Sequence, residues 1–320
     1  MVHLARAHKV TALLPVKNGE KYLESLMPQI ISNTNSSDEI IVINDHSTDN
    51  TKRELLKWKK ELPNLRIIDS SEPGLVNALN LGLRESSNTW IARFDVDDNY
   101  DPQRLSKQIE AIQANDVAVF SDYAMTSEGK RDLGTIYSPV NPLACSISLI
   151  NSERTAHPSA IINKDAAWAV GGYLNEDFLV EDLSLWLRLS RAGNLRSVPE
   201  TLLYYTLSAN SVSARNRALM IKNKTELLKR LPINPNHLKD VQLDYEEYFY
   251  RGIPNAGIRQ LLFLRDISTV SSFYGETNDV QLRRFVKTFF NFPDRIFLDT
   301  ANLISHKIAR DIIRRLPNYF

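Results

Sequence analysis

Over the first 120 residues, short apolar runs alternate with longer stretches in which apolar residues recur at helical spacing. The apolar runs are rich in leucine and β-branched residues, which predicts buried strands; they span residues 9–16, 39–43, 65–68, 89–94 and 117–120. The stretches between them predict helices at residues 20–31, 48–62, 73–83 and 101–115. This alternation is typical of βαβ units, so we expect an α/β fold with a mostly parallel sheet flanked by helices.

The pattern is less regular in residues 121–153 and then recovers. Strands are predicted at residues 159–162, 195–198 and 202–205, and helices at 164–170 and 182–192, with a sharp turn at Gly171 and Gly172. Beyond about residue 213 the strand pattern disappears, and residues 216–231 are predicted to be helical. We therefore expect an α/β domain over residues 1–215 and a helical C-terminal region over residues 216–320.

Composition and charge narrow the class of protein. Hydrophobic residues at 43% and charged residues at 24% are ordinary for a globular chain. A net charge of +1 argues against nucleic acid as a partner. The single cysteine, Cys145, cannot form an internal disulfide and is expected to be a small buried residue. Without a signal-peptide pattern or an apolar run of about 18 residues, we expect a cytoplasmic protein.

Polar side chains follow three of the predicted strands, where each strand ends. Asn18, Asp45 and the pair Asp95 and Asp97 occupy these positions. The carboxyl ends of parallel strands share an edge of the sheet, where ligands bind in open α/β folds. Two carboxylates so close in sequence suit Mn²⁺ or Mg²⁺. An ordinary Asp-rich turn is the alternative for this Asp-x-Asp (DxD) motif.

Six segments, in order, resemble those of family 2 glycosyltransferases, which have the GT-A fold. They cover about residues 9–206: PVKNGEKYL (15–23), IIVINDHSTDNT (40–51), PGLVNALNLGL (73–83), IARFDVDDNYDPQRLSKQ (91–108), HPSAIINKDAAWAVGGY (157–173) and VEDLSLWLRLSRAG (180–193). The resemblance implies a nucleotide-sugar-dependent enzyme of the bacterial surface-polysaccharide type.

The resemblance also implies residues for binding the nucleotide sugar. Pro15, Val16 and Asn18 correspond to the first nucleotide-binding loop, and Asp45 to the aspartate that contacts the nucleobase or ribose. The chain departs from the family at His46, where a glycine is usual.

The resemblance assigns the chemistry to a second set of residues. Arg93 corresponds to the basic residue before the metal motif, and Asp95 and Asp97 to the pair that holds the metal on the donor diphosphate. Asp182 corresponds to the catalytic base, and Glu181 either assists it or completes a helix cap. A single base opposite the leaving group implies inversion at the anomeric carbon.

Further positions keep two interpretations each. His157 is either a histidine packed on the sheet or a group near the metal or acceptor. Asp98 either orients the metal ligands or caps a turn. Trp186 and Trp168 are expected in the core, with a place beneath a sugar ring as the alternative.

The predicted function is that of an inverting hexosyl- or N-acetylhexosaminyl-transferase, which moves a sugar from a UDP-sugar to a hydroxyl of a glycan or lipid-linked acceptor. A sugar nucleotidylyltransferase is the alternative enzyme, although residues 15–19 do not form its glycine-rich phosphate loop. A non-catalytic nucleotide-sugar binding module is the other alternative. The state of association, monomer or oligomer, is open.

Residues 281–320 combine eight basic with three acidic side chains and interleave them with phenylalanine and isoleucine. Such a segment suits either peripheral contact with the inner face of the membrane or packing on protein.

Overall fold

The computed structural model describes residues 7–127, 132–140, 142–151, 155–208 and 211–230. The chain divides into two compact units, residues 1–231 and 232–320, and the described fold belongs to the first. The segment 281–320 lies outside the described residues. Within the described part of the chain, no helix is both long and apolar enough to cross a membrane.

A mixed sheet runs through the unit in the order β3-β2-β1-β4-β8-β6-β9-β5, with β7 beside β6. The first four strands in this order are parallel, and so are the long strands β6 and β9. β8, β5 and β7 each pair antiparallel to their neighbours. The bounds are β1 Val10–Val16, β2 Glu39–Asn44, β3 Leu65–Asp69, β4 Trp90–Arg93, β5 Asn99–Tyr100, β6 Asp116–Ser127, β7 Asp132–Ile136, β8 Ile161–Asn163 and β9 Asn194–Leu207. The expected α/β fold is confirmed, and its sheet is mixed, with as many antiparallel as parallel pairs among the described strands.

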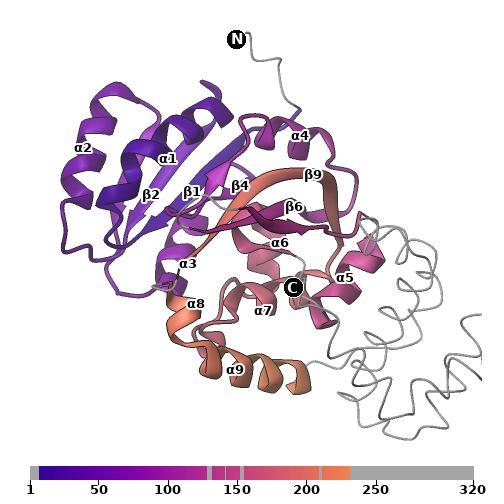
Figure 1. The fold of residues 1–320 in the computed structure, drawn as a ribbon. Helices are drawn as coiled ribbons and strands as arrows, with labels where there is room; N and C mark the ends of the chain where they lie inside the picture. The colour runs from indigo at the N-terminus through magenta and orange to yellow at the C-terminus, as the bar shows by residue number, and fades with distance from the viewer. Residues whose placement is uncertain (1–6, 128–131, 141, 152–154, 209–210, 231–320) are drawn as a thin grey trace, which may run out of the picture. The chain divides into compact units, whose positions relative to one another are not determined.

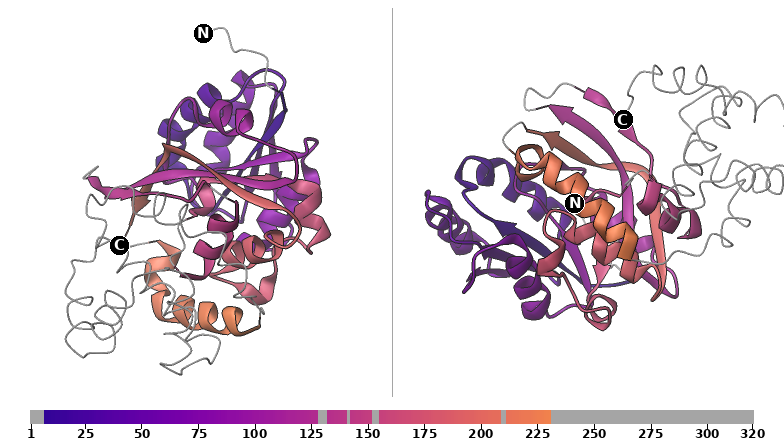
Figure 2. Two further views of the ribbon diagram at one scale, coloured as in Figure 1. Left: turned by 90° about the vertical axis from the view of Figure 1, so that its right-hand side faces the viewer. Right: turned by 90° about the horizontal axis from the view of Figure 1, so that it is seen from below.

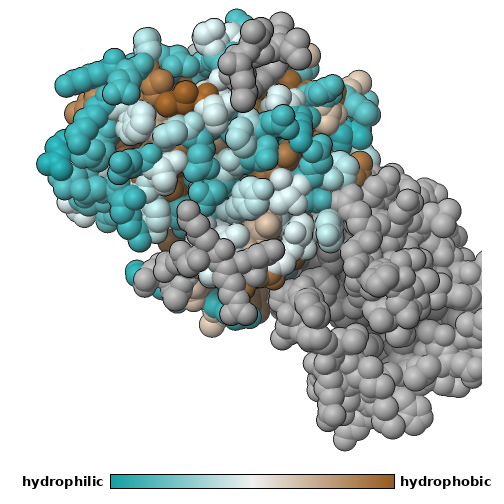
Figure 3. Space-filling view, turned by 45° about the horizontal axis from the view of Figure 1, so that its top comes forward, coloured by the Kyte–Doolittle hydropathy of each residue, from teal (hydrophilic) through white to brown (hydrophobic). Residues whose placement is uncertain are grey.

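Helices cover both faces of this sheet (Figures 1 and 2). The helices α1 (Glu20–Asn33), α2 (Thr51–Glu61) and α4 (Arg104–Glu110) lie on one face, and α3 (Leu75–Glu85), α6 (Lys164–Ala169) and α7 (Glu181–Leu189) on the other. Hydrophilic side chains cover the outer surface of α2 (Figure 3). The fold continues into α8 (Val212–Arg215) and α9 (Arg217–Arg230), so the helix predicted at residues 216–231 is confirmed.

α3 packs unusually close to β1 because it carries a glycine at the contact. A Cβ added to Gly82 would lie 2.7 Å from Cδ2 of Leu13, well inside van der Waals contact. A larger residue at this position in the helix would therefore have to displace the fully buried Leu13 side chain.

Residues 121–153, whose sequence pattern is irregular, contain regular secondary structure that the sequence did not predict. β6 continues to Ser127, β7 follows it, and Pro142–Asn151 forms the helix α5, which contains the buried Cys145. Burial raises the pKa of the Cys145 thiol to about 12, in line with the expected inert, buried residue.

Two further predictions need correction. The strands predicted at residues 195–198 and 202–205 are one strand, β9, whose register against β6 shifts near Ser121 and Asp122. The helix predicted from residue 101 begins at Arg104, because Asp101 first forms a turn in which its Oδ1 accepts the Gln103 N–H at 2.8 Å.

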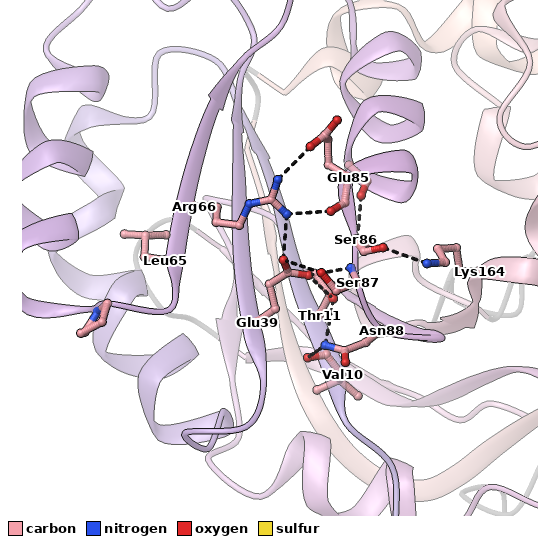
Figure 4. A network of polar contacts seen from close by, with 12 residues as sticks. Val10, Thr11, Glu39, Leu65, Arg66, Glu85, Ser86, Ser87, Asn88 and Lys164 are labelled. Carbon is pink, nitrogen blue, oxygen red and sulfur yellow. Dashed lines mark hydrogen bonds and ion pairs between the residues drawn. The ribbon is translucent and has the colours of Figure 1, made fainter.

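A polar cluster joins β1, β2, β3 and the end of α3 at the amino ends of the strands (Figure 4). Arg66 donates to Glu39 and to Glu85, each at 2.8 Å. Glu39 also accepts from the Thr11 hydroxyl at 2.8 Å and the Ser87 N–H at 3.0 Å. Burial acts to raise the pKa of Glu39, but these hydrogen bonds outweigh it and leave the pKa below its ordinary value. The cluster lies at the end of the sheet opposite the loop that carries Asp95, Asp97 and Asp98 after β4 (the Asp-rich loop), so we interpret it as structural.

Candidate active site

A cavity of about 590 Å³ opens at the carboxyl ends of β1, β2 and β4, where the sequence predicted a ligand site. One wall comes from β1, β2 and the start of α3, and consists of Pro15, Val16, Lys17, Asp45, Gly74, Leu75 and Ala78. Arg93 and Asp95 line the cavity between the walls. The rest of the lining comes from later in the chain: Tyr123, Met125, Thr155, Ala156, His157, Pro158, Phe178, Leu179, Val180, Glu181, Asp182, Leu183, Trp186, Tyr205, Val212, Ser213 and Met220.

Asp45 is held in a defined position on the first wall. Its main-chain N–H donates to the carbonyl of Val16 at 2.8 Å, and its Oδ1 accepts the N–H of Gly74 at 2.9 Å. Gly74 has φ of 116°, a backbone conformation that favours glycine. Pro15, Val16 and Asp45 thus lie together in the wall, as their assignment to one binding site requires.

Asn18 does not line the cavity. Its side-chain Oδ1 accepts the Thr48 N–H at 2.8 Å, and its own N–H donates to the Ser47 hydroxyl at 3.0 Å. It therefore joins the loop after β1 to the loop after β2. His46, next to this contact, has φ of 53°, which explains why glycine is usual there in the family.

The loop after β4 concentrates three carboxylates. Arg93, which is 2% exposed, donates from Nη2 to Oδ1 of Asp95 at 2.5 Å. Burial, and then the charge of Asp95, raise the pKa of Asp97 to about 6. Oδ1 of Asp98 accepts the N–H of Thr206 at 2.8 Å, while Oδ2 is buried without a partner. The loop thus carries more negative charge than its hydrogen bonds balance.

These residues fit a divalent cation. A cation between Asp95 and Asp97 would relieve the repulsion that raises the pKa of Asp97. Among the described residues, no group of three or more His, Cys, Asp or Glu side chains is arranged to hold a metal ion. A site with two carboxylate ligands suits Mg²⁺ or Mn²⁺, which keep coordination positions for water and substrate phosphates.

The amino end of α7 brings two more carboxylates to the cavity. Asp182 Oδ1 accepts the N–H of Leu183 at 2.7 Å, at the helix end that carries partial positive charge. Glu181 is 7% exposed, its Oε2 has no hydrogen-bond partner, and burial raises its pKa. Leu179, just before the helix, has φ of 71°, a strained value for a branched side chain.

His157 lies in the cavity wall and is also packed on the sheet. Its Nε2 lies 2.8 Å from the Tyr173 hydroxyl. Burial, and then the charge of Arg93, lower the pKa of His157 well below its usual range, so the ring is neutral. Trp186 lines the cavity but is 1% exposed and packs edge-on against Phe120, which confirms a core position.

Two parts of the site were not recognised from the sequence. Tyr123 and Tyr205 lie on neighbouring strands with ring centroids 6.2 Å apart, and both line the cavity. Met125 on β6 and Leu203 on β9 lie two residues from these tyrosines and share their face of the sheet, so this spacing of two was the available signal. The prediction for Trp168 was wrong: it is 39% exposed, because only one side of the short helix α6 is covered.

Residues 11–166 match the profile of "Glycosyl transferase family 2". The match covers just under half of the chain, and over these residues the chain is similar to that family. It is therefore an enzyme, a glycosyltransferase, as the six segments implied.

Two bacterial relatives show how far the similarity extends. The amylovoran biosynthesis glycosyltransferase AmsE of Erwinia amylovora is 27% identical over 218 residues, which cover 67% of this chain and 79% of AmsE. The UDP-Gal:alpha-D-GlcNAc-diphosphoundecaprenol beta-1,3-galactosyltransferase of Escherichia coli is 27% identical over 206 residues, 62% of this chain and 74% of that enzyme.

The fold is that of solved glycosyltransferases. The mannosyltransferase PcManGT from Pyrobaculum calidifontis, solved in complex with GDP-Man and Mn²⁺, superposes with a TM-score of 0.58 at 16% identity. The superposition covers 95% of this chain and 82% of that one. The glycosyltransferase therefore has the GT-A fold.

Proposed function

We propose that this glycosyltransferase moves a hexosyl or N-acetylhexosaminyl group from a UDP-sugar to a hydroxyl of a glycan or lipid-linked acceptor, with inversion, in the synthesis of a cell-surface polysaccharide. The observation that carries the proposal is the shared cavity. It brings Asp45, Arg93 and Asp95 together with Glu181 and Asp182, although the two groups are far apart in the sequence.

The wall formed by β1, β2 and α3 is our proposed donor site. Asp45 is buried, and the Gly74 N–H orients its carboxylate, so it is prepared to accept hydrogen bonds from a nucleoside. The name of the Escherichia coli relative specifies UDP-Gal, which supports a UDP-sugar as donor.

Asp95 and Asp97 are our proposed ligands for Mn²⁺ or Mg²⁺. A bound cation would neutralise charge on the departing diphosphate. Arg93 holds the Asp95 carboxylate in place, and its buried charge adds to the positive potential beside the phosphates. The Mn²⁺ named with PcManGT supports a metal of this kind.

Asp182 is our proposed general base. As the acceptor oxygen forms a bond to the anomeric carbon, the bond from that carbon to the diphosphate oxygen breaks, and Asp182 takes the hydroxyl proton. The Leu183 N–H holds the Asp182 carboxylate at the amino end of α7, whose partial positive charge stabilises a carboxylate there. A single displacement inverts the anomeric configuration.

The opposite wall is our proposed acceptor site. Tyr123 and Tyr205 present aromatic surface there, which suits the apolar face of a sugar ring. The names of the two relatives specify amylovoran biosynthesis and a diphosphoundecaprenol-linked acceptor, which supports a polysaccharide pathway and a lipid-linked glycan. The segment 281–320 is our candidate for contact with the inner face of the membrane.

Substitution of the base tests the proposal. In Asp182→Asn we expect transfer from UDP-sugars, or hydrolysis in the absence of acceptor, to fall about 10²–10⁴-fold, because the amide cannot accept the proton. Stabilisation by UDP with Mn²⁺, measured as a melting-temperature shift, should persist. Asp165→Asn, an exposed aspartate on α6, is the matched control. Full activity of Asp182→Asn would disprove the mechanism and favour a different base.

A further inference from the structure

Arg104, the first residue of α4, is a fully buried cation behind the Asp-rich loop. It is 0% exposed and forms no salt bridge with a carboxylate of the described residues, although the charges of Asp98 and Asp95 act to favour its protonated form. Its Nε donates to Gln108 Oε1 at 3.0 Å and its Nη2 to the carbonyl of Ala160 at 3.2 Å, while Nη1 has no hydrogen-bond partner. A buried charge without a paired carboxylate is costly, so its retention requires a compensating interaction.

Two aromatic rings provide part of that compensation. The guanidinium carbon lies 4.6 Å from the ring centroid of Phe94 and 4.9 Å from that of Tyr100. These are distances at which a cation is attracted to an aromatic face. The two rings also contact each other, with centroids 4.6 Å apart.

The two rings mark the ends of the Asp-rich loop. Phe94 immediately precedes Asp95, and Tyr100 closes the loop after Asn99. The Asp95 N–H donates to the Tyr100 hydroxyl at 2.6 Å, and that hydroxyl in turn donates to the Asp95 carbonyl at 3.3 Å. Arg104 therefore contacts the residue that precedes Asp95 and the residue whose hydroxyl bonds the Asp95 main chain.

A second set of hydrogen bonds holds Arg104 itself in place. Gln108 donates to the carbonyls of Val119 on β6 and Ser159 at 2.9 and 2.8 Å. Arg104 is thus anchored to the rigid sheet on one side and contacts the loop on the other. Burial lowers the pKa of Arg104 to about 10, which leaves it cationic at neutral pH.

We propose that Arg104 is a positioning residue that acts through Phe94 and Tyr100 to hold Asp95 and its loop in the conformation that binds the metal and diphosphate. The inference rests on the proposed function of Asp95 and Asp97. Electrostatics alone makes the opposite prediction, because removal of a nearby positive charge would strengthen Mn²⁺ binding. The direction of the change therefore separates the two effects.

The test measures Mn²⁺ binding in the presence of UDP by electron paramagnetic resonance. We expect Arg104→Met and Tyr100→Phe each to weaken Mn²⁺ binding about 10-fold or more, as loss of outer contacts to metal ligands does. Arg104→Lys, which keeps the charge without the planar group, should restore part of the loss. The double variant should bind no more weakly than Arg104→Met, because both changes break the same connection.

The control and the melting temperature separate positioning from a general loss of stability. Leu55→Ala removes buried volume on α2, away from the loop, and should lower the melting temperature without changing Mn²⁺ binding. Unchanged or tighter Mn²⁺ binding by Arg104→Met would overturn the proposal. Should that variant not fold, normal binding by Tyr100→Phe would overturn it equally. Absence of Mn²⁺ and UDP binding by the unaltered protein would instead contradict the proposed function.

Discussion

Glu181→Gln should make this glycosyltransferase more stable and less active. The side chain is 7% exposed, its Oε2 has no partner, and burial raises its pKa, so the folded state disfavours the ionised carboxylate. An unsatisfied buried acceptor costs about 1–3 kcal/mol, and more when it is charged. Against this, a negative charge at a helix amino end contributes about 0.3–1 kcal/mol. The new amide keeps an unpaired polar group, so we expect a net gain of about 1 kcal/mol.

The gain should depend on pH in a defined direction. A carboxyl whose pKa is raised on folding binds its proton more tightly in the folded state, so the wild type regains stability as pH falls through that raised pKa. The difference between Glu181→Gln and the wild type should therefore be largest near pH 8 and shrink toward pH 4.5, the ordinary pKa of glutamate. Urea denaturation at both pH values measures it, with m-values compared to verify the two-state assumption.

A neighbouring residue offers the matched control. Glu176 precedes α7 and is exposed, so Glu176→Gln should change the free energy of unfolding by less than about 0.5 kcal/mol at either pH. In the unaltered protein Glu181 places a carboxylate that folding disfavours beside the proposed base, and we take this as a sign that the charge serves the reaction. Transfer activity should therefore fall in Glu181→Gln, which removes that charge. A variant that is no more stable than the wild type at pH 8 would refute the reasoning, since the helix end would then outweigh burial.

Two other substitutions test the packing and the backbone. Gly82→Ala should lower the free energy of unfolding, because overlap of its Cβ with Leu13 costs about 1–3 kcal/mol and the gain in helix propensity is only about 1 kcal/mol. Denaturant titration should show that adding Leu13→Ala restores part of the lost stability. A Gly82→Ala variant more stable than the wild type would contradict the close packing of α3 on β1. His46→Gly should raise the free energy of unfolding by about 0.5 kcal/mol. The left-handed conformation costs a non-glycine residue about 1–2 kcal/mol, and the greater backbone entropy that glycine loses on folding offsets part of that gain. His46→Ala, which keeps a Cβ, should show no gain, and equal stabilities of the Gly and Ala variants would disprove the argument.

The alternation of strands and helices was predictable because it depends on local periodicity. The strands β1 to β4 and the helix α1 lie within a few residues of their predicted bounds. The meeting of Asp45 and Asp95 at one edge of the sheet also followed from the sequence, since parallel strands place their carboxyl ends together. The hydrophobic pattern did not predict β7 or α5, because apolar residues in these segments do not recur at a clear strand or helix spacing.

Other features depend on which segments pack together, and only the tertiary structure decided them. Trp168 and Trp186 both lie in predicted helices, yet one is exposed and the other buried, because only α7 is enclosed on the side of its tryptophan. Tyr123 and Tyr205 join the cavity through the pairing of β6 with β9, which brings together residues distant in the chain. Arginine is a hydrophilic residue type, but Arg104 is buried because α4 packs its side chain against the ring of Phe94. A sequence determines which residues prefer to be buried, whereas the packing of distant elements determines which neighbours surround them.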